Sequence, residues 1–143
     1  MRIEVPHQGL SVDIEQGEWE VDAAPDEVIA LHGIYLRSST FGFYMNVRRE
    51  SSVARTLDDV GMIALLREQT WGGAPFEEWS ACTDDIVVAG GCFEAPTMPD
   101  EFVVESFLTD GKSVANIVGP VQRVGLSESL AIVKRLAATL RFA

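Results

Sequence analysis

The residues with reactive side chains are few and scattered along the chain. His7, His32, Cys82 and Cys92 are its only histidines and cysteines. No two of them have the spacing of CxxC or HExxH, in which one turn or one helix face presents two metal ligands together. His32 stands in an apolar stretch, where a histidine is more often a core residue than a ligand. The sequence therefore predicts no metal site.

Nucleophilic and acid–base chemistry is no better supported. Ser127 lies in the sequence Gly-Leu-Ser-Glu-Ser, which lacks the second glycine of GxSxG, and no histidine is placed to serve as its base. No pair of carboxylates is singled out by apolar surroundings, which would raise the pKa of one of them. The glycine pairs at 72–73 and 90–91 do not form a phosphate-binding loop. We therefore expect no catalytic residues, no cofactor and no enzymatic activity.

The two cysteines are expected to be free. Residues 83–85 read Thr-Asp-Asp, which is typical of a turn. Such a turn would pair Cys82 with residues near Val87 and not with Cys92. A disulfide is the alternative, but two buried thiols fit the pattern better and indicate a reducing compartment. The N-terminus lacks the apolar core of a signal peptide, so we expect a cytoplasmic protein.

Composition sets limits on the class of partner. The chain has 143 residues and a formal net charge of −11, with 47% hydrophobic residues. This length predicts a single domain over residues 1–143 with a real core. Strong negative charge disfavours nucleic acids and anionic membranes, which need clusters of lysine and arginine. It mildly favours a basic partner, although solubility alone would explain it. No apolar run is long enough to span a membrane.

The element that the rest of the chain must accommodate is the C-terminal stretch. Leu130, Val133, Leu136, Ala137 and Leu140 recur at helical spacing, with charged residues on the opposite side. This pattern predicts an amphipathic helix over residues 127–141. Its first residue, a serine, is expected to cap the helix through its hydroxyl group.

Alternating apolar and polar residues predict the strands that this helix covers. Asp110-Gly111 is the favoured turn pair of a hairpin and joins two of them, while Gly119-Pro120 is expected to end the second. Gly33 is expected to form a bulge. The predicted strands span residues 10–14, 19–21, 28–36, 41–47, 76–82, 86–94, 102–108 and 113–118.

A second helix is predicted over about residues 57–69, with a polar connection over residues 48–55 before it. This helix carries more apolar residues than one buried face needs. Met62 and Leu66 project away from the predicted inward stripe, and Trp71 opens the glycine-rich loop that follows. A covering loop would explain the two helix residues, and Trp71 could instead fold back over the core. The functional interpretation is a partner-binding face, because large apolar and aromatic residues are common anchors at interfaces.

The order of elements resembles that of the Mog1/PsbP/DcrB-like domains. An early Gly-Glu-Trp sequence (Gln16-Gly-Glu-Trp19) leads into strands, and the last helix closes in Leu-Arg-Phe at residues 140–142. The resemblance implies an α+β fold with a largely antiparallel, twisted sheet of about six to eight strands, packed by two main helices (about 57–69 and 127–141) as an α/β/α sandwich. It also implies a non-catalytic role, because members of this family bind proteins or assist assembly and secretion, and the DcrB-like set includes chaperones that shield apolar helices.

The leading hypothesis is a non-enzymatic protein-binding module, in the form of a cytoplasmic chaperone or adaptor. Met62, Leu66 and Trp71 are its expected contact residues, and its partner is expected to be basic or to expose an apolar helix. One alternative is an acidic immunity protein that neutralises a basic toxin. Another is a small-molecule carrier with an apolar cavity lined by Trp19, Phe43 and Trp79. The oligomeric state stays open, with a homodimer through a sheet edge or the middle helix as one option.

Overall fold

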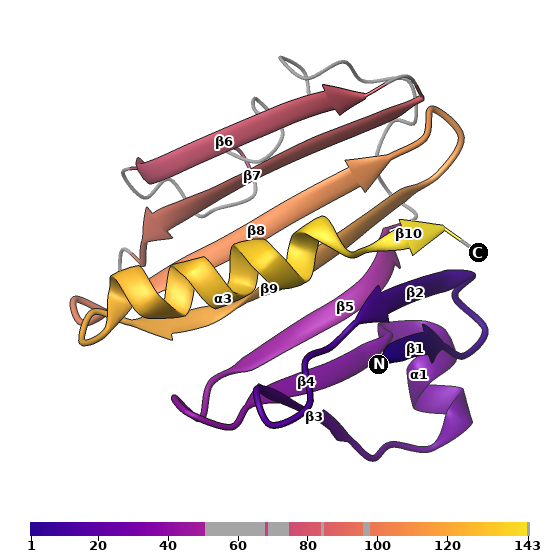
Figure 1. Ribbon diagram of the computed structural model, residues 1–143, viewed down its shortest axis with the longest axis horizontal. Helices are drawn as coiled ribbons and strands as arrows, with labels where there is room; N and C mark the ends of the chain where they lie inside the picture. Colours follow the sequence, from indigo (N-terminus) through magenta and orange to yellow (C-terminus); the bar gives the residue numbers. More distant parts are fainter. Residues whose placement is uncertain (51–67, 69–74, 84, 96–97, 143) are drawn as a thin grey trace.

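A computed structural model describes residues 1–50, 68, 75–83, 85–95 and 98–142. Its centre is a seven-stranded antiparallel sheet with the strand order β3-β4-β5-β9-β8-β7-β6 (Figure 1). The strands are β3 (Trp19–Asp22), β4 (Ile34–Ser38), β5 (Tyr44–Glu50), β6 (Pro75–Thr83), β7 (Ile86–Glu94), β8 (Glu101–Thr109) and β9 (Val114–Gln122).

One face of this sheet carries a second layer. Helix α3 (Leu126–Ala138) lies over β8 and β9, and a small sheet of β1 (Arg2–Val5), β2 (Leu10–Asp13) and β10 (Arg141–Phe142) lies beside its C-terminal end (Figure 1). The order β1-β2-β10 joins the two ends of the described chain in one sheet. Helix α1 (Asp26–His32) is short and connects β3 to β4.

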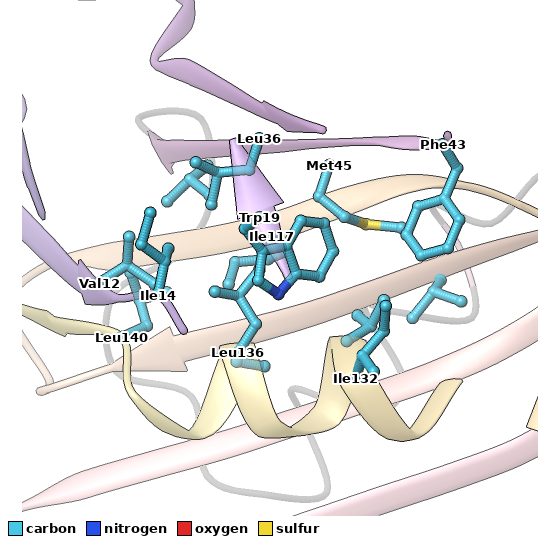
Figure 2. Packing of buried hydrophobic residues seen from close by; sticks show 14 of the residues in the cluster. Val12, Ile14, Trp19, Leu36, Phe43, Met45, Ile117, Ile132, Leu136 and Leu140 are labelled. Atoms are coloured by element: carbon cyan, nitrogen blue, oxygen red, sulfur yellow. The ribbon is translucent and has the colours of Figure 1, made fainter. Parts of the chain in front are cut away.

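The hydrophobic core fills the space between the two layers. Figure 2 shows Leu136 and Ile132 of α3 against the sheet, with Trp19 between the helix and β5. Burial of this apolar surface is the main force that holds the layers together. The core cluster takes members from the small sheet, the large sheet and α3, among them Val12, Ile14, Leu36, Met45, Ile117, Leu136 and Leu140.

The hairpin between β8 and β9 confirms its sequence signal. Gly111 has a φ of 84°, which glycine adopts without steric cost. The Asp110 carboxylate accepts hydrogen bonds from the backbone N–H groups of Lys112 (2.9 Å) and Ser113 (2.8 Å). These bonds close the turn and help to set the register in which Thr109 lies opposite Val114.

The predicted strand over residues 28–36 is wrong in its first half. Residues Asp26–His32 form α1, and β4 begins only at Ile34. Pro25 precedes the helix, two acidic residues occupy its first turn, and Gly33 ends it with a φ of 76°. Gly33 therefore ends the helix and is not a bulge. Only glycine fits at this position, because a β-carbon would lie 2.0 Å from the Val47 carbonyl oxygen.

Three elements also have boundaries that differ from the predictions. Strand β5 begins at Tyr44, after Gly42, and continues to Glu50, so residues 48–50 are strand and not a polar connection. Strand β9 does not end at Gly119-Pro120 but continues to Gln122. Helix α3 begins one residue before the expected cap, after Gly125 in a left-handed conformation, and no side chain caps it.

The predicted helix over residues 57–69 falls outside the described residues, apart from Glu68. Its two proposed contact residues and Trp71 are therefore not placed. The α+β class and the largely antiparallel sheet are confirmed by the rest of the chain. No helix among the described residues is both long and apolar enough to cross a membrane.

Candidate functional site

The second layer does not cover the whole face of the large sheet. Helix α3 lies over β8 and β9, and the small sheet shares the core with β4 and β5. Within the described parts of the chain, no element lies over the same face of β6 and β7. An open groove runs there, between the flank of α3 and the edge strand β6.

The deeper part of the groove has a volume of about 440 Å³ and is lined mainly by apolar atoms. The strand pairs Trp79–Gly90 and Ala81–Val88 form its floor, because these residues face the α3 side of the sheet. Small residues of α3 form one wall, and this leaves the space open. The lining residues are Trp79, Ser80, Ala81, Ile86, Val88, Lys134, Ala137, Ala138 and Arg141.

Trp79 lies flat on the floor of the groove because its cross-strand partner is glycine. A β-carbon added to Gly90 would stand 2.3 Å from Cε2 of the indole ring, so any larger residue would displace the ring. The Lys134 ammonium lies 4.8 Å from the centre of the same ring. A cation at this distance over an indole face is attracted by the negative charge of the π-system.

Lys134 divides the groove into two parts. Its ammonium forms an ion pair with the Glu77 carboxylate at 2.9 Å, and this pair bridges from α3 to the edge strand. Beyond the pair, a shallower depression of about 480 Å³ continues beside Phe76, Leu130 and Ala131. The phenyl ring of Phe76 is 57% exposed, so this end of the groove also presents apolar surface.

Arg141 borders the other end of the groove. Its Nη1 donates hydrogen bonds to the carbonyl oxygens of Ala138 (3.0 Å) and Leu140 (2.6 Å), which fixes the guanidinium at the end of α3. Within the described residues no carboxylate forms an ion pair with Arg141. The apolar groove thus carries two cations in a chain of strongly negative net charge.

The cysteines are both free, as predicted, but only one is buried. Cys82 is exposed on β6, opposite Val87 of β7, which is the pairing that the sequence indicates. Cys92 is fully buried in the core, and this burial raises the pKa of its thiol to about 12. A thiol with such a pKa stays protonated and unreactive at neutral pH.

A second group of polar residues lies on the opposite face of the large sheet. Glu105 is 5% exposed, and its carboxylate accepts a hydrogen bond of 2.7 Å from Nδ2 of the buried Asn116. The Glu105 pKa is raised to about 7, chiefly by burial, with a small contribution from the neighbouring Glu50 and against the lowering effects of the Asn116 hydrogen bond and Arg48. This group stands apart from the groove, whose lining residues come from the α3 side.

The residues proposed from the sequence fare unequally. Trp79 does line an apolar groove between the sheet and α3, but among the described residues no pocket is lined by Trp79 together with Trp19 and Phe43. Those two rings are buried in the core, where they pack edge to face with centroids 5.8 Å apart. Met62, Leu66 and Trp71 lie outside the described residues.

The sequence alone did not predict that Lys134, Arg141 and Gly90 contribute to a groove. Lys134 and Arg141 appear in the sequence only as the polar side of an amphipathic helix. Gly90 shows its role only once the register places it beneath Trp79. The sequence instead favoured Met62, Leu66 and Trp71, and this prediction stays untested because these residues lie outside the described part of the chain.

The comparison with known proteins identifies the fold. The solution structure of cyanobacterial PsbP (CyanoP) from Synechocystis sp. PCC 6803 is similar over 100% of this chain and 92% of the other, with a TM-score of 0.63 and 11% sequence identity. The chain has a PsbP-like fold. This confirms the resemblance to Mog1/PsbP-like domains at the level of fold, and an identity of 11% carries no residue role across.

Comparisons at the level of sequence find no match for this chain. No protein-family model matches the chain, and no curated protein matches it. Among the described residues, no three His, Cys, Asp or Glu side chains are grouped so that they could hold a metal ion. Among the described residues, the groove is therefore the feature of this PsbP-like fold from which a function can be inferred.

Proposed function

We propose that this protein is a non-enzymatic binding module, an adaptor or chaperone, whose groove between α3 and β6–β7 receives an apolar segment of a partner protein. The observation that carries the proposal is the apolar strip over β6 and β7, which no other described element covers. Both parts of the groove, on either side of the Lys134–Glu77 ion pair, are open to solvent, so they suit a segment of a protein chain better than an enclosed small ligand.

The width of the uncovered strip fits one helix. Neighbouring strands lie about 4.8 Å apart, and a helix with its side chains is about 10 Å wide, so one helix covers two strands. In the described parts, α3 covers β8 and β9, and the small sheet packs over β4 and β5. The two strands that remain, β7 and β6, leave room for one further helix beside α3.

The chemistry of the strip agrees with such an occupant. Trp79, Ile86 and Val88 offer an apolar floor, and the α3 wall is built of small residues that allow a second helix to approach closely. Trp79 is the natural anchor, because partly exposed aromatic residues contribute strongly to interfaces. An amphipathic helix would bury its apolar face on this floor and leave its polar face in water.

The volume of the groove is also compatible with a small-molecule ligand. About 440 Å³ lies within the range of small-ligand sites, which is roughly 300–1,000 Å³. A small amphiphilic molecule is therefore the second candidate ligand. The immunity-protein hypothesis rests on net charge alone, and the groove adds nothing to it.

The proposal is tested by a matched pair of variants. Ala81→Arg fills the groove from the exposed edge strand, whereas Val124→Arg makes the same change in charge at a residue that is 87% exposed and outside the groove. Both proteins are first compared by circular dichroism. Each is then used to capture partners from the native cell and is titrated with an amphipathic Leu/Ala peptide of about 18 residues, long enough to be helical. Binding is followed by the change in tryptophan fluorescence, to which Trp79 contributes from the groove.

The expected result is that the parent and Val124→Arg bind the peptide and retain the same cellular partner, while Ala81→Arg loses both. Apolar contacts should make this binding only weakly dependent on salt. Equal binding by all three proteins would refute the groove as the site. A partner that low salt retains and high salt releases, independently of Ala81→Arg, would favour the acidic inhibitor instead.

A further inference from the structure

We propose that the groove selects for negative charge: the segment that it binds carries a carboxylate, which pairs with Arg141 at the end of the apolar floor. This inference rests on the proposed function and adds the chemistry of the partner. The observations behind it are the positions of Lys134 and Arg141 in the groove and the groups with which each of them already interacts.

The Arg141 side chain is held in place without being neutralised. Its Nη1 is engaged by the carbonyl oxygens of Ala138 and Leu140, and neither acceptor carries a formal charge. The other guanidinium nitrogens form no hydrogen bond with described residues. A fixed guanidinium with free N–H groups can bind a carboxylate through two parallel hydrogen bonds, and little side-chain entropy is lost because the group is already ordered.

Lys134 differs from Arg141 in this respect. Its charge is balanced by Glu77 at 2.9 Å, and it also lies over the Trp79 ring. Lys134 therefore belongs to the wall of the groove, while Arg141 is the cation that remains available. The carboxylate of the partner is expected at the Arg141 end, beyond the apolar floor formed by Ile86 and Val88.

The charge of the whole chain makes this arrangement specific. With 22 acidic and 11 basic residues, most of the surface repels an acidic segment. Among the described residues, Arg37, Arg48 and Arg135 form ion pairs with carboxylates, at 3.8, 3.5 and 2.7 Å. Arg2, Arg49 and Arg123 form none with described carboxylates, but they do not line the groove, so in this part of the chain only Arg141 combines an available guanidinium with the apolar floor. A segment that is both apolar and acidic would therefore be favoured at the groove, which provides orientation as well as affinity.

The test uses three amphipathic helical peptides of about 18 residues with the same Leu/Ala stripe. They differ only at the two ends of the stripe, which carry glutamate, glutamine or lysine, and circular dichroism verifies that their helicity is equal. Each is titrated into the parent protein, Arg141→Gln and Arg37→Gln, with tryptophan fluorescence as the readout. Arg37 lies on β4, far across the sheet from the groove, so its variant controls for the change in net charge.

The parent and Arg37→Gln should bind the glutamate peptide about fivefold more tightly than the glutamine peptide, as expected for one partly exposed ion pair. The lysine peptide should bind most weakly. In Arg141→Gln the preference for glutamate over glutamine should disappear, while the glutamine peptide keeps its affinity.

The outcomes separate this inference from the function on which it rests. Equal binding of the three peptides to the parent would overturn the charge preference and leave the apolar groove standing. A preference that survives in Arg141→Gln would overturn the role of Arg141. Failure of all peptides to bind would overturn both proposals, and binding of dodecanoate instead would assign the groove to a small amphiphile.

Discussion

Replacing Glu105 by glutamine should stabilise the protein at alkaline pH. The carboxylate is buried, and its pKa rises from 4.5 to about 7, chiefly because burial disfavours the charged form. In the unfolded chain the same group ionises near pH 4.5. The folded protein therefore holds a proton that the unfolded chain releases between these two values, and its stability falls as the pH rises through this window.

The size of the effect follows from the two pKa values. One pKa unit corresponds to about 1.4 kcal/mol, so full ionisation of Glu105 costs about 3 kcal/mol of stability above pH 7. Glutamine has nearly the same shape and never ionises. Its carbonyl oxygen can still accept the Asn116 hydrogen bond, and its amide can donate to Oδ1 of Asn116, which accepts no hydrogen bond from any described residue.

Urea denaturation at pH 5 and pH 8 measures the effect. With a urea m-value of about 2 kcal/mol/M, Glu105→Gln should raise the midpoint by about 1.5 M at pH 8. At pH 5 the two proteins should differ by no more than about 1 kcal/mol, because Glu105 is protonated in the folded state. Glu94→Gln, at an exposed position, is the control and should leave the pH dependence unchanged. A Glu105→Gln protein with the parent's pH dependence, or with lower stability at pH 8, would refute the reasoning.

Three further predictions concern the core and the groove. Gly90→Val should destabilise the fold by about 1–3 kcal/mol, since its side chain must displace Trp79, and the tryptophan emission should shift to longer wavelength. Leu136→Ala should lower the free energy of unfolding by about 2–5 kcal/mol, because it opens a cavity between α3 and the sheet. In the folded protein a maleimide should modify Cys82 within minutes and leave Cys92 intact, and both thiols should react in urea.

Each of these measurements has an internal control. In a Trp79→Ala background, Gly90→Val should cost much less than in the parent, and an equal cost would mean that the ring is not what the side chain meets. Leu31→Ala, at a residue that is 76% exposed, should change stability by less than about 0.5 kcal/mol. Cys82→Ser should abolish labelling of the folded protein, and residual labelling would contradict the burial of the second thiol.

Local sequence pattern predicted most of the strands but not the short helix α1. Alternation works where one face of a strand is buried, as in β2, in which Leu10 and Val12 point into the core. It failed at residues 26–32, where apolar residues suggested a central strand although only Ile29 is buried. The signals for a helix were present, namely Pro25 before it and Gly33 after it, but the apolar residues between them led to the prediction of a strand.

The groove could not be predicted from the sequence, because it depends on which strands α3 covers. The α3 pattern shows that one face is buried but not against which pair of strands. Arg141 illustrates the difficulty. In the sequence it is a cation near a helix C-terminus, where it suits the helix dipole, and only the packed structure places it at the end of an apolar floor.

The small sheet that joins both ends of the chain has a consequence for the order of folding. Strands β6 to β9 pair as successive hairpins between near neighbours in sequence, whereas β2 must wait for residues 141–142 to complete its sheet. Contacts between residues far apart in sequence form late in folding, because the chain loses conformational entropy on closing the long loop before the new contacts stabilise it. We therefore expect pulse-labelled hydrogen exchange to protect β7 and β8 before β2, and the reverse order would contradict this. Until the small sheet and α3 dock, the apolar inner face of the large sheet is exposed, and among the described residues the groove is the part of this face that stays open after folding.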